Sequence, residues 1–320
     1  MISLIATVYN EVDTLLVWLQ SMRAQTVPPD EIIIVDAGST DGTWELLKEE
    51  ALHNPSLKIF QEKGNIAHGR NVAINRAKGE YIVVADAGCM YTPTWFGKIT
   101  ASLDTKNIQF ATTAFAPWFK KGDTMSIYLI AAATIPTAKE FRKQWLPSSR
   151  SVAFRKHLWE SVQGYPEWLP ICEDVVFDLA IERMGIQPVY IREPLVLWRP
   201  RLTLKKYCVQ LFKYTRGDGH AGLFFSRQLV RYSVYGMSIA LLVVALTNYQ
   251  FAIVLIGGIV IYNYTFWKRW INFTQDKNIL YRGLGILLVP FVIALGDVAK
   301  MCGWPVGVWE RKIRKIAPTV

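Results

Sequence analysis

The first third of the chain alternates apolar runs with amphipathic segments. Runs rich in β-branched and apolar residues predict strands at residues 2–8, 31–36, 57–61 and 81–86. Helical periodicity predicts helices between or after them, at residues 13–25, 43–51 and 67–77. This order predicts right-handed βαβ units, and therefore an α/β fold with a Rossmann-like, mostly parallel sheet flanked by helices.

Polar residues follow three of the predicted strands at their carboxyl ends. The apolar run 32–35 ends at Asp36, which opens the Gly-rich turn 36–43. Thr7 to Glu11 follow the first strand, and Asp86 ends another. Because open α/β sheets bind ligands at the carboxyl ends of their strands, we expect these residues to form one ligand rim. Taken alone, the turn after Asp36 is explained equally well as a tight connection that caps the next helix.

Two predicted helix starts add charged groups. Gly69-Arg70-Asn71 lies at the start of the helix 67–77, where an arginine is suited to phosphate. Glu173 and Asp174 begin a helix over 173–184 that ends at Gly185. Asp174 can simply cap this helix, or it can be a reactive carboxylate whose negative charge the helix dipole favours.

The pattern changes near residue 203. Residues 203–214 place apolar and aromatic side chains at helical spacing with lysines between them, which is typical of an interfacial helix on an anionic membrane. A surface helix packed on the soluble domain is the alternative. Residues 214–220, which end at His220, are a candidate loop over the ligand site.

Two charge-free segments, about 232–247 and 251–267, predict membrane spans, although each is shorter than the ~20 residues of a full span. Basic residues flank both outer ends, which are therefore expected on the cytoplasmic side. A third run, 283–298, is broken by Pro290, and crossing would carry the basic tail to the outer side. We expect two spans and a re-entrant or interfacial third element, with three spans as the alternative.

Composition agrees with a soluble domain joined to membrane segments, because 51% of the 320 residues are apolar and 19% are charged. The net charge of +10 indicates an anionic partner. The basic residues flank apolar spans instead of forming a stripe on a polar fold, so we expect no nucleic acid. The four cysteines lack metal-ligand spacing, which suggests a reduced environment; they are Cys89, Cys172, Cys208 and Cys302. No secretory leader is expected at the N-terminus.

The order and spacing of the motifs resemble the family 2 glycosyltransferases, whose fold is the nucleotide-sugar-binding GT-A fold. The resemblance covers residues 1 to about 200. It rests on Thr7–Glu11, Asp36–Thr43, Gly69-Arg70-Asn71 with Gly79–Ile82, Asp86 and Glu173-Asp174. It implies a hexosyltransferase-like enzyme that inverts the sugar's configuration.

The resemblance also implies residue roles. Thr7, Tyr9 and Glu11 would line the nucleoside pocket. Asp36 would bond the base or ribose, and Arg70 would approach the base or the phosphates. Asp86 corresponds to the first acid of the Asp-x-Asp motif, near the ribose and a divalent cation, Mg²⁺ or Mn²⁺. Asp174 would be the catalytic base.

One position departs from the family pattern, because Gly88 stands in place of the second acid. A cation would then have one carboxylate ligand fewer. Either Asp86 and the diphosphate hold it with waters, or basic residues share the task. Arg199 and Arg201 are candidates, since arginine can bond a diphosphate with two parallel donors. Juxtamembrane anchoring explains these two arginines equally well.

We therefore expect a GT-A domain at 1–200, an interfacial helix and loop at 201–228, and a membrane region with a basic cytoplasmic tail at 229–320. The expected function is a membrane-anchored glycosyltransferase of cell envelope glycan biosynthesis, working at the cytoplasmic face. It would move a sugar from a nucleotide-diphosphate donor to a lipid or lipid-linked acceptor. The alternative is a degenerate GT-A membrane protein that binds nucleotide or a partner without catalysis.

Overall fold

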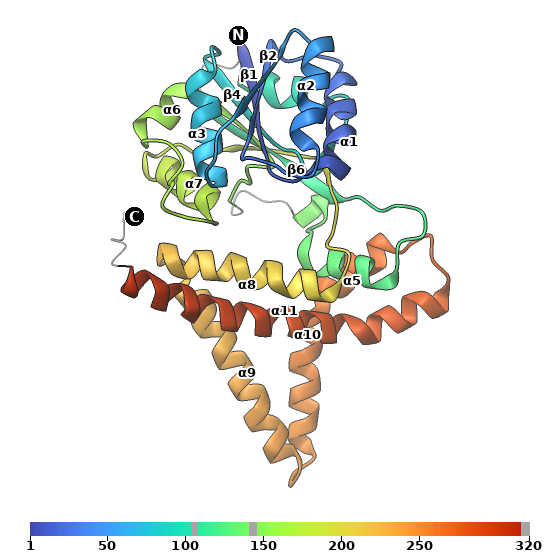
Figure 1. Ribbon diagram of the computed structural model, residues 1–320. Helices are drawn as coiled ribbons and strands as arrows, with labels where there is room; N and C mark the ends of the chain where they lie inside the picture. Colours follow the sequence, from blue (N-terminus) through green and yellow to red (C-terminus); the bar gives the residue numbers. More distant parts are fainter. Residues whose placement is uncertain (104–107, 141–145, 315–320) are drawn as a thin grey trace. The chain divides into compact units, whose positions relative to one another are not determined.

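The computed structural model describes residues 1–103, 108–140 and 146–314 (Figure 1). These residues form two compact units. The first unit comprises the described residues of Met1–Trp118 and Pro136–Arg199, and the second comprises Phe119–Ile135 and the described residues from Pro200 to Arg314.

The first unit is built on a mixed sheet of eight strands in the order β3-β2-β1-β4-β7-β6-β8-β5. Strands β1 to β4 run parallel to one another, whereas β7 is antiparallel to β4 and β6, and β5 is antiparallel to β8. The strands are β1 (Ile2–Val8), β2 (Glu31–Asp36), β3 (Leu57–Gln61), β4 (Tyr81–Asp86), β5 (Cys89–Tyr91), β6 (Phe110–Pro117), β7 (Ser151–Arg155) and β8 (Val189–Trp198). All four predicted strands coincide with β1 to β4.

Helices cover both faces of this sheet (Figure 1). They are α1 (Val12–Arg23), α2 (Thr43–His53), α3 (Ile66–Arg76), α4 (Trp95–Ala101), α6 (Lys156–Ser161) and α7 (Glu173–Arg183), with a 3-10 turn at Ala138–Glu140. Along β1, Leu4 and Ala6 pack with α1, α2 and α4, whereas Ile5 packs with α3, α6 and α7. The central strands are therefore buried on both faces, which explains their continuous apolar runs and confirms the predicted α/β class.

The second unit consists of α5 (Met125–Thr134), α8 (Leu204–Ala221), α9 (Phe225–Ala245), α10 (Gln250–Phe273) and α11 (Ile279–Ile313). Helices α9, α10 and α11 are each long and apolar enough to cross a membrane. Within this unit α8 and α11 lie side by side, and α9 and α10 form a hairpin that projects away from that pair (Figure 1).

Glycines allow α8 and α11 to approach closely. A Cβ added at Gly303 would lie 2.3 Å from the carbonyl oxygen of Phe212, and one at Gly307 would lie 2.0 Å from that of Arg216. From the other helix, a Cβ at Gly219 would lie 2.3 Å from the carbonyl oxygen of Trp304. Small residues at a helix interface are typical of packing in or on membranes.

A buried carboxylate joins the three apolar helices. Asp297 of α11 is 2% exposed. It accepts hydrogen bonds from Arg231 and Tyr235 of α9, from Tyr262 of α10, and from Lys300 one turn away. A charge in an apolar segment is costly unless it is paired, so this cluster holds α9 and α10 against α11.

Three expectations are corrected in this unit. The structure assigns residues 119–135 to the second unit instead of the predicted 1–200 domain, because Tyr128 and Leu129 of α5 pack in one core with Trp270. Residues 214–220 are no loop: they continue α8, and His220 is buried with Nε2 2.6 Å from Glu310. Pro290 does not break the third run, since α11 continues through it.

The glycine contacts predict that Gly307→Ala destabilises the second unit. The added methyl group would overlap the Arg216 backbone, and overpacking of this kind costs about 1–3 kcal/mol. Gly257→Ala in α10 is the matched control, because its Cβ meets nothing within 4 Å; alanine should leave stability unchanged or raise it there. Thermal unfolding in detergent micelles checks both variants, and equal midpoints would contradict the close helix packing.

Candidate active site

The carboxyl ends of three adjacent parallel strands bring the predicted rim residues together. Val8 at the end of β1 is in register with Asp36 at the end of β2. On the other side of β1, Thr7 is in register with Asp86 at the end of β4. The rim predicted from the sequence is therefore one continuous edge of the sheet, at the place where α/β folds bind ligands.

The Asp36 carboxylate organises the turn that follows it. Asp36 is completely buried, and it accepts hydrogen bonds from the backbone N–H groups of Gly38 and Ser39 and from the Gln61 side chain at 2.8 Å. Gly38 and Gly42 have φ of 91° and 98°, which favour glycine. Asp36 thus fixes the rim loop in place, and its expected contact with the base or ribose stays a prediction.

The loop after β1 is tied to this turn. The Asn10 backbone N–H donates to Ser39 Oγ, and Asn10 Oδ1 accepts from the Thr40 N–H at 2.9 Å. Tyr9 is 60% exposed beside this contact. The Glu11 N–H donates to Thr43 Oγ1 at 2.9 Å. Two rim loops therefore form one rigid surface that presents an aromatic ring to solvent.

Arg70 forms a buried ion pair that the sequence did not predict. Its guanidinium donates to the Glu173 carboxylate at 2.6 Å, and the two side chains are only 7% and 6% exposed. Arg70 is therefore a buried partner of Glu173, and its expected approach to the base or the phosphates stays a prediction. Burial and the neighbouring Asp174 charge raise the pKa of Glu173, and the Arg70 charge opposes that rise.

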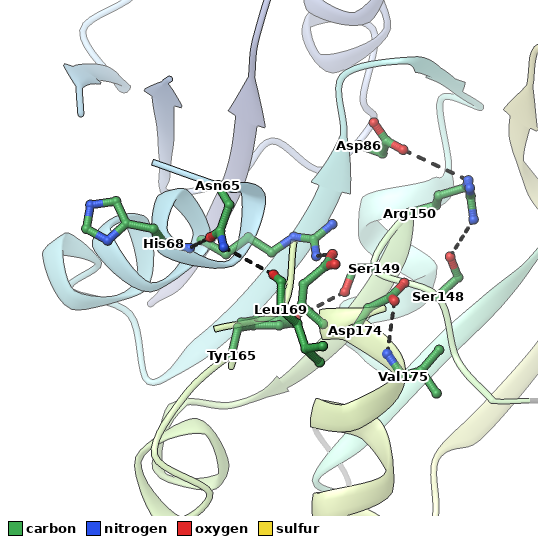
Figure 2. A network of polar contacts seen from close by, with 12 residues as sticks. Asn65, His68, Asp86, Ser148, Ser149, Arg150, Tyr165, Leu169, Asp174 and Val175 are labelled. Carbon is green, nitrogen blue, oxygen red and sulfur yellow. Dashed lines mark hydrogen bonds and ion pairs between the residues drawn. The ribbon is translucent and has the colours of Figure 1, made fainter. Parts of the chain in front are cut away.

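Two asparagines join α3 to the loop that precedes α7. Asn71 Nδ2 donates to the Tyr165 carbonyl at 2.8 Å, and Asn71 Oδ1 accepts from the Tyr165 N–H and from Trp159 Nε1. Asn65 Nδ2 donates to the Leu169 carbonyl (Figure 2). The start of α7 is thus held to α3 by backbone and side-chain bonds, in addition to the Arg70–Glu173 pair.

Asp174 lies next to this anchored pair, in the first turn of α7. Its Oδ1 accepts from the Val175 N–H at 2.9 Å, and its side chain is only partly buried (Figure 2). Burial lowers the pKa of Arg70, but the charges of Glu173, Asp174 and Asp86 raise it overall. The charges of Asp174 and Asp86 thus both act on the same buried guanidinium, which relates the start of α7 to the sheet rim.

Arg150 is a rim residue that the sequence did not reveal. Its Nε lies 3.9 Å from Asp86 Oδ2 (Figure 2). Its guanidinium carbon lies 4.0 Å from the centre of the Trp198 ring. Residue 150 comes from the irregular stretch between β6 and α7, where no periodicity pointed to a site. Only the antiparallel pairing of β7 with β4 brings Arg150 next to Asp86, and this pairing was not predicted from the sequence.

The two arginines predicted at the diphosphate, Arg199 and Arg201, fall in different units. Arg199 Nη1 donates to the Trp118 carbonyl at 2.9 Å within the first unit. Arg201 is exposed and belongs to the second unit. Their role at a diphosphate stays a prediction.

Asp86 is the residue that fits a divalent cation. It ends β4 with its side chain 39% exposed. Among the described residues no three His, Cys, Asp or Glu side chains form a metal-binding group. One carboxylate suits a Mg²⁺-like ion that takes its remaining ligands from diphosphate oxygens and water.

Comparison with known proteins identifies the class. Residues 3–156 match the profile of glycosyl transferase family 2. The mannosyltransferase PcManGT from Pyrobaculum calidifontis, solved in complex with GDP-Man and Mn2+, has a similar fold with a TM-score of 0.56, at 15% identity over 99% of this chain and 88% of that chain. Residues 3–156 are therefore similar to the glycosyltransferases of family 2, and the first unit has the GT-A fold.

Two curated relatives are similar over parts of the chain. UDP-Glc:alpha-D-GlcNAc-diphosphoundecaprenol beta-1,3-glucosyltransferase WfaP of Escherichia coli is 30% identical over 35% of this chain and 44% of its own length. The succinoglycan biosynthesis protein ExoA of Rhizobium meliloti is 23% identical over 65% of this chain and 66% of its own length. The chain thus spans less than two thirds of the length of either relative.

Asp178 lies one turn after Asp174 and is buried without compensation. It is 2% exposed, and neither carboxylate oxygen has a hydrogen-bond partner among the described residues. Burial raises the pKa of Asp178 well above its usual value, and the Asp174 charge adds to the rise while Arg70 opposes it. The pKa of Asp178 is higher in the folded state than in the unfolded state. Its contribution to the free energy of unfolding is therefore fully present at pH values below the pKa of the unfolded state. It is lost as pH rises through the pKa of the folded state.

Asp178→Asn should therefore stabilise the protein progressively as pH rises, since the amide cannot ionise. We expect nearly equal thermal midpoints near pH 4 and a clearly higher midpoint for the variant at pH 8. Glu182→Gln, an exposed position on the same helix, should show no such pH-dependent gain. A thermal unfolding series across pH measures this, and a gain that did not grow with pH would contradict the buried, unpaired carboxyl.

Proposed function

We propose that this protein transfers a hexose from a nucleoside-diphosphate donor to a lipid or lipid-linked acceptor, with inversion at the anomeric carbon. The observation that carries the proposal is the placement of Asp174. It is a partly exposed carboxylate at a helix start that the Arg70–Glu173 pair and two asparagines fix near the family's donor rim.

The proposed reaction uses these groups in one displacement. The Asp174 carboxylate takes the proton from an acceptor hydroxyl as its oxygen attacks the anomeric carbon. The bond between that carbon and the diphosphate oxygen breaks, and the electron pair leaves with the nucleoside diphosphate. The rim formed by Thr7, Tyr9 and Asp36 would hold the nucleoside and so orient the donor.

A divalent cation would be held by Asp86. When bound, Mg²⁺ or Mn²⁺ neutralises charge on the departing diphosphate. The fit rests on Asp86, a partly exposed carboxylate at the strand end. The Mn2+ in the PcManGT complex supports use of a cation in this fold.

A membrane-located acceptor is supported by the second unit. Pro200 continues directly from the first unit into helices that include three candidate spans. The relative WfaP acts on a diphosphoundecaprenol-linked sugar, as its name states. Arginines and lysines flank the α9–α10 hairpin at its outer ends, which favours a catalytic domain on the cytoplasmic side. A role in building cell envelope glycans follows from such an acceptor.

Asp174→Asn should lower the transfer rate by about 10²–10⁴-fold, the usual contribution of a general base, and leave donor binding within twofold. Transfer is measured with membranes as the acceptor source and a panel of nucleotide sugars, and donor binding is measured by calorimetry. Glu182→Gln on the same helix is the control and should be fully active. Full activity of Asp174→Asn would overturn the assignment. Donor binding without transfer by the wild-type protein would favour the degenerate, non-catalytic alternative.

The topology that we propose has two spans, α9 and α10, with α11 lying against α8 at the interface. It predicts that the C-terminus lies on the same side of the membrane as the N-terminal domain. Epitope tags at the two ends should therefore become protease-accessible in the same population of sealed vesicles, either inverted or right-side-out. Accessibility of the tags in opposite populations would instead show that α11 crosses as a third span.

A further inference from the structure

The structure places a guanidinium beside Asp86, next to the position where the family's second acid is missing. Strand β7 is antiparallel to β4 with Ala85 opposite Ser151, so the chain just before Ser151 runs alongside the residue after Ala85. This register brings Arg150 next to Asp86. Its Nε lies 3.9 Å from Asp86 Oδ2 (Figure 2).

Arg150 is held in this position by several elements. Its guanidinium stacks over the Trp198 ring of β8, and its Nη1 donates to Ser148 Oγ at 2.8 Å. The Arg150 carbonyl accepts from the Tyr91 hydroxyl at 2.7 Å, and that hydroxyl also accepts from the Asp86 N–H at 2.8 Å. Because Tyr91 bonds both backbones, it fixes Arg150 and Asp86 relative to each other.

The charge balance at this corner suits a polyanion. Gly88 contributes no carboxylate, so Asp86 is the acid at this strand end, and the Arg150 side chain is still 19% exposed. At 3.9 Å from Asp86 Oδ2, Arg150 Nε forms an ion pair with the carboxylate, so positive and negative charge meet at this strand end. A guanidinium forms paired, charge-assisted hydrogen bonds to phosphate oxygens.

Two other arginines that the sequence pointed to have partners of their own in the first unit. Arg70 is buried against Glu173, and Arg199 donates to the Trp118 carbonyl. Arg150 is held in place by Tyr91, is partly exposed and lies beside Asp86.

We propose that Arg150 binds the diphosphate of the donor and supplies positive charge that a second acid with its metal ion would otherwise provide. This inference rests on the proposed function. It implies that the affinity for a nucleoside diphosphate has a large part that does not depend on a divalent cation.

The test measures binding of UDP and GDP, and of uridine and guanosine, to the full-length protein in detergent micelles. Calorimetry is run with EDTA and again with Mn²⁺. Wild-type protein should bind one of the diphosphates in EDTA. Arg150→Gln should weaken that binding at least tenfold while leaving the affinity for the matching nucleoside unchanged, which also shows that the variant is folded. Arg150→Lys keeps the positive charge but loses the planar guanidinium group, so its diphosphate affinity should lie between those of the wild type and Arg150→Gln.

Arg155→Gln is the matched control. Arg155 lies at the other end of β7, where it pairs with Glu80 and stacks over Tyr81, and its replacement should leave both affinities unchanged. Equal diphosphate binding by wild type and Arg150→Gln, or an equal fall in nucleoside affinity, would overturn this inference alone. Loss of all wild-type diphosphate binding in EDTA, with binding restored by Mn²⁺, would do the same. Absence of any nucleotide binding by the wild type would overturn the proposed function and this inference with it.

Discussion

The buried pair between Arg70 and Glu173 is the interaction on which the site depends. It joins α3, which carries Arg70, to α7, which carries Glu173 and Asp174. Two charges removed from water stabilise little in themselves, but removal of either partner leaves the other buried and unpaired. The pair therefore fixes one arrangement of the two helices. Asp174 takes its position from Glu173, the residue before it in the chain, while remaining partly exposed.

Four acidic residues near the site of the first unit differ in burial. Asp36 and Glu173 are buried: Asp36 holds the rim turn against which the nucleoside is proposed to lie, and Glu173 holds Arg70. Asp86 and Asp174 are partly exposed and available to a substrate. The second unit follows the same physical rule in apolar surroundings, where Asp297 is buried but receives hydrogen bonds from three helices. In both units a buried carboxylate joins elements that are distant in the sequence.

Local pattern was enough to predict β1 to β4, the helices between them and the common rim, because periodicity and turn chemistry are local properties. It failed where a partner lies far along the chain. The start of α3 suggested a phosphate contact for Arg70, but the pattern did not reveal its ion pair with Glu173, 103 residues later. Arg150 was missed because only the pairing of β7 with β4 brings it to the rim. The helix α11 continues through Pro290, although proline removes one backbone hydrogen bond. Neighbouring helices can compensate for such a loss, and the local sequence pattern does not reveal them.

The most direct measurement is an experimental structure of the protein with a nucleoside diphosphate bound. We expect the nucleoside to lie against the rim of Thr7, Tyr9 and Asp36, and the diphosphate to lie between Asp86 and Arg150. The ion pair between Arg70 and Glu173 should stay intact. A diphosphate held by Arg70, with Glu173 released, would contradict this expectation, as would a nucleotide bound away from the carboxyl ends of β1, β2 and β4.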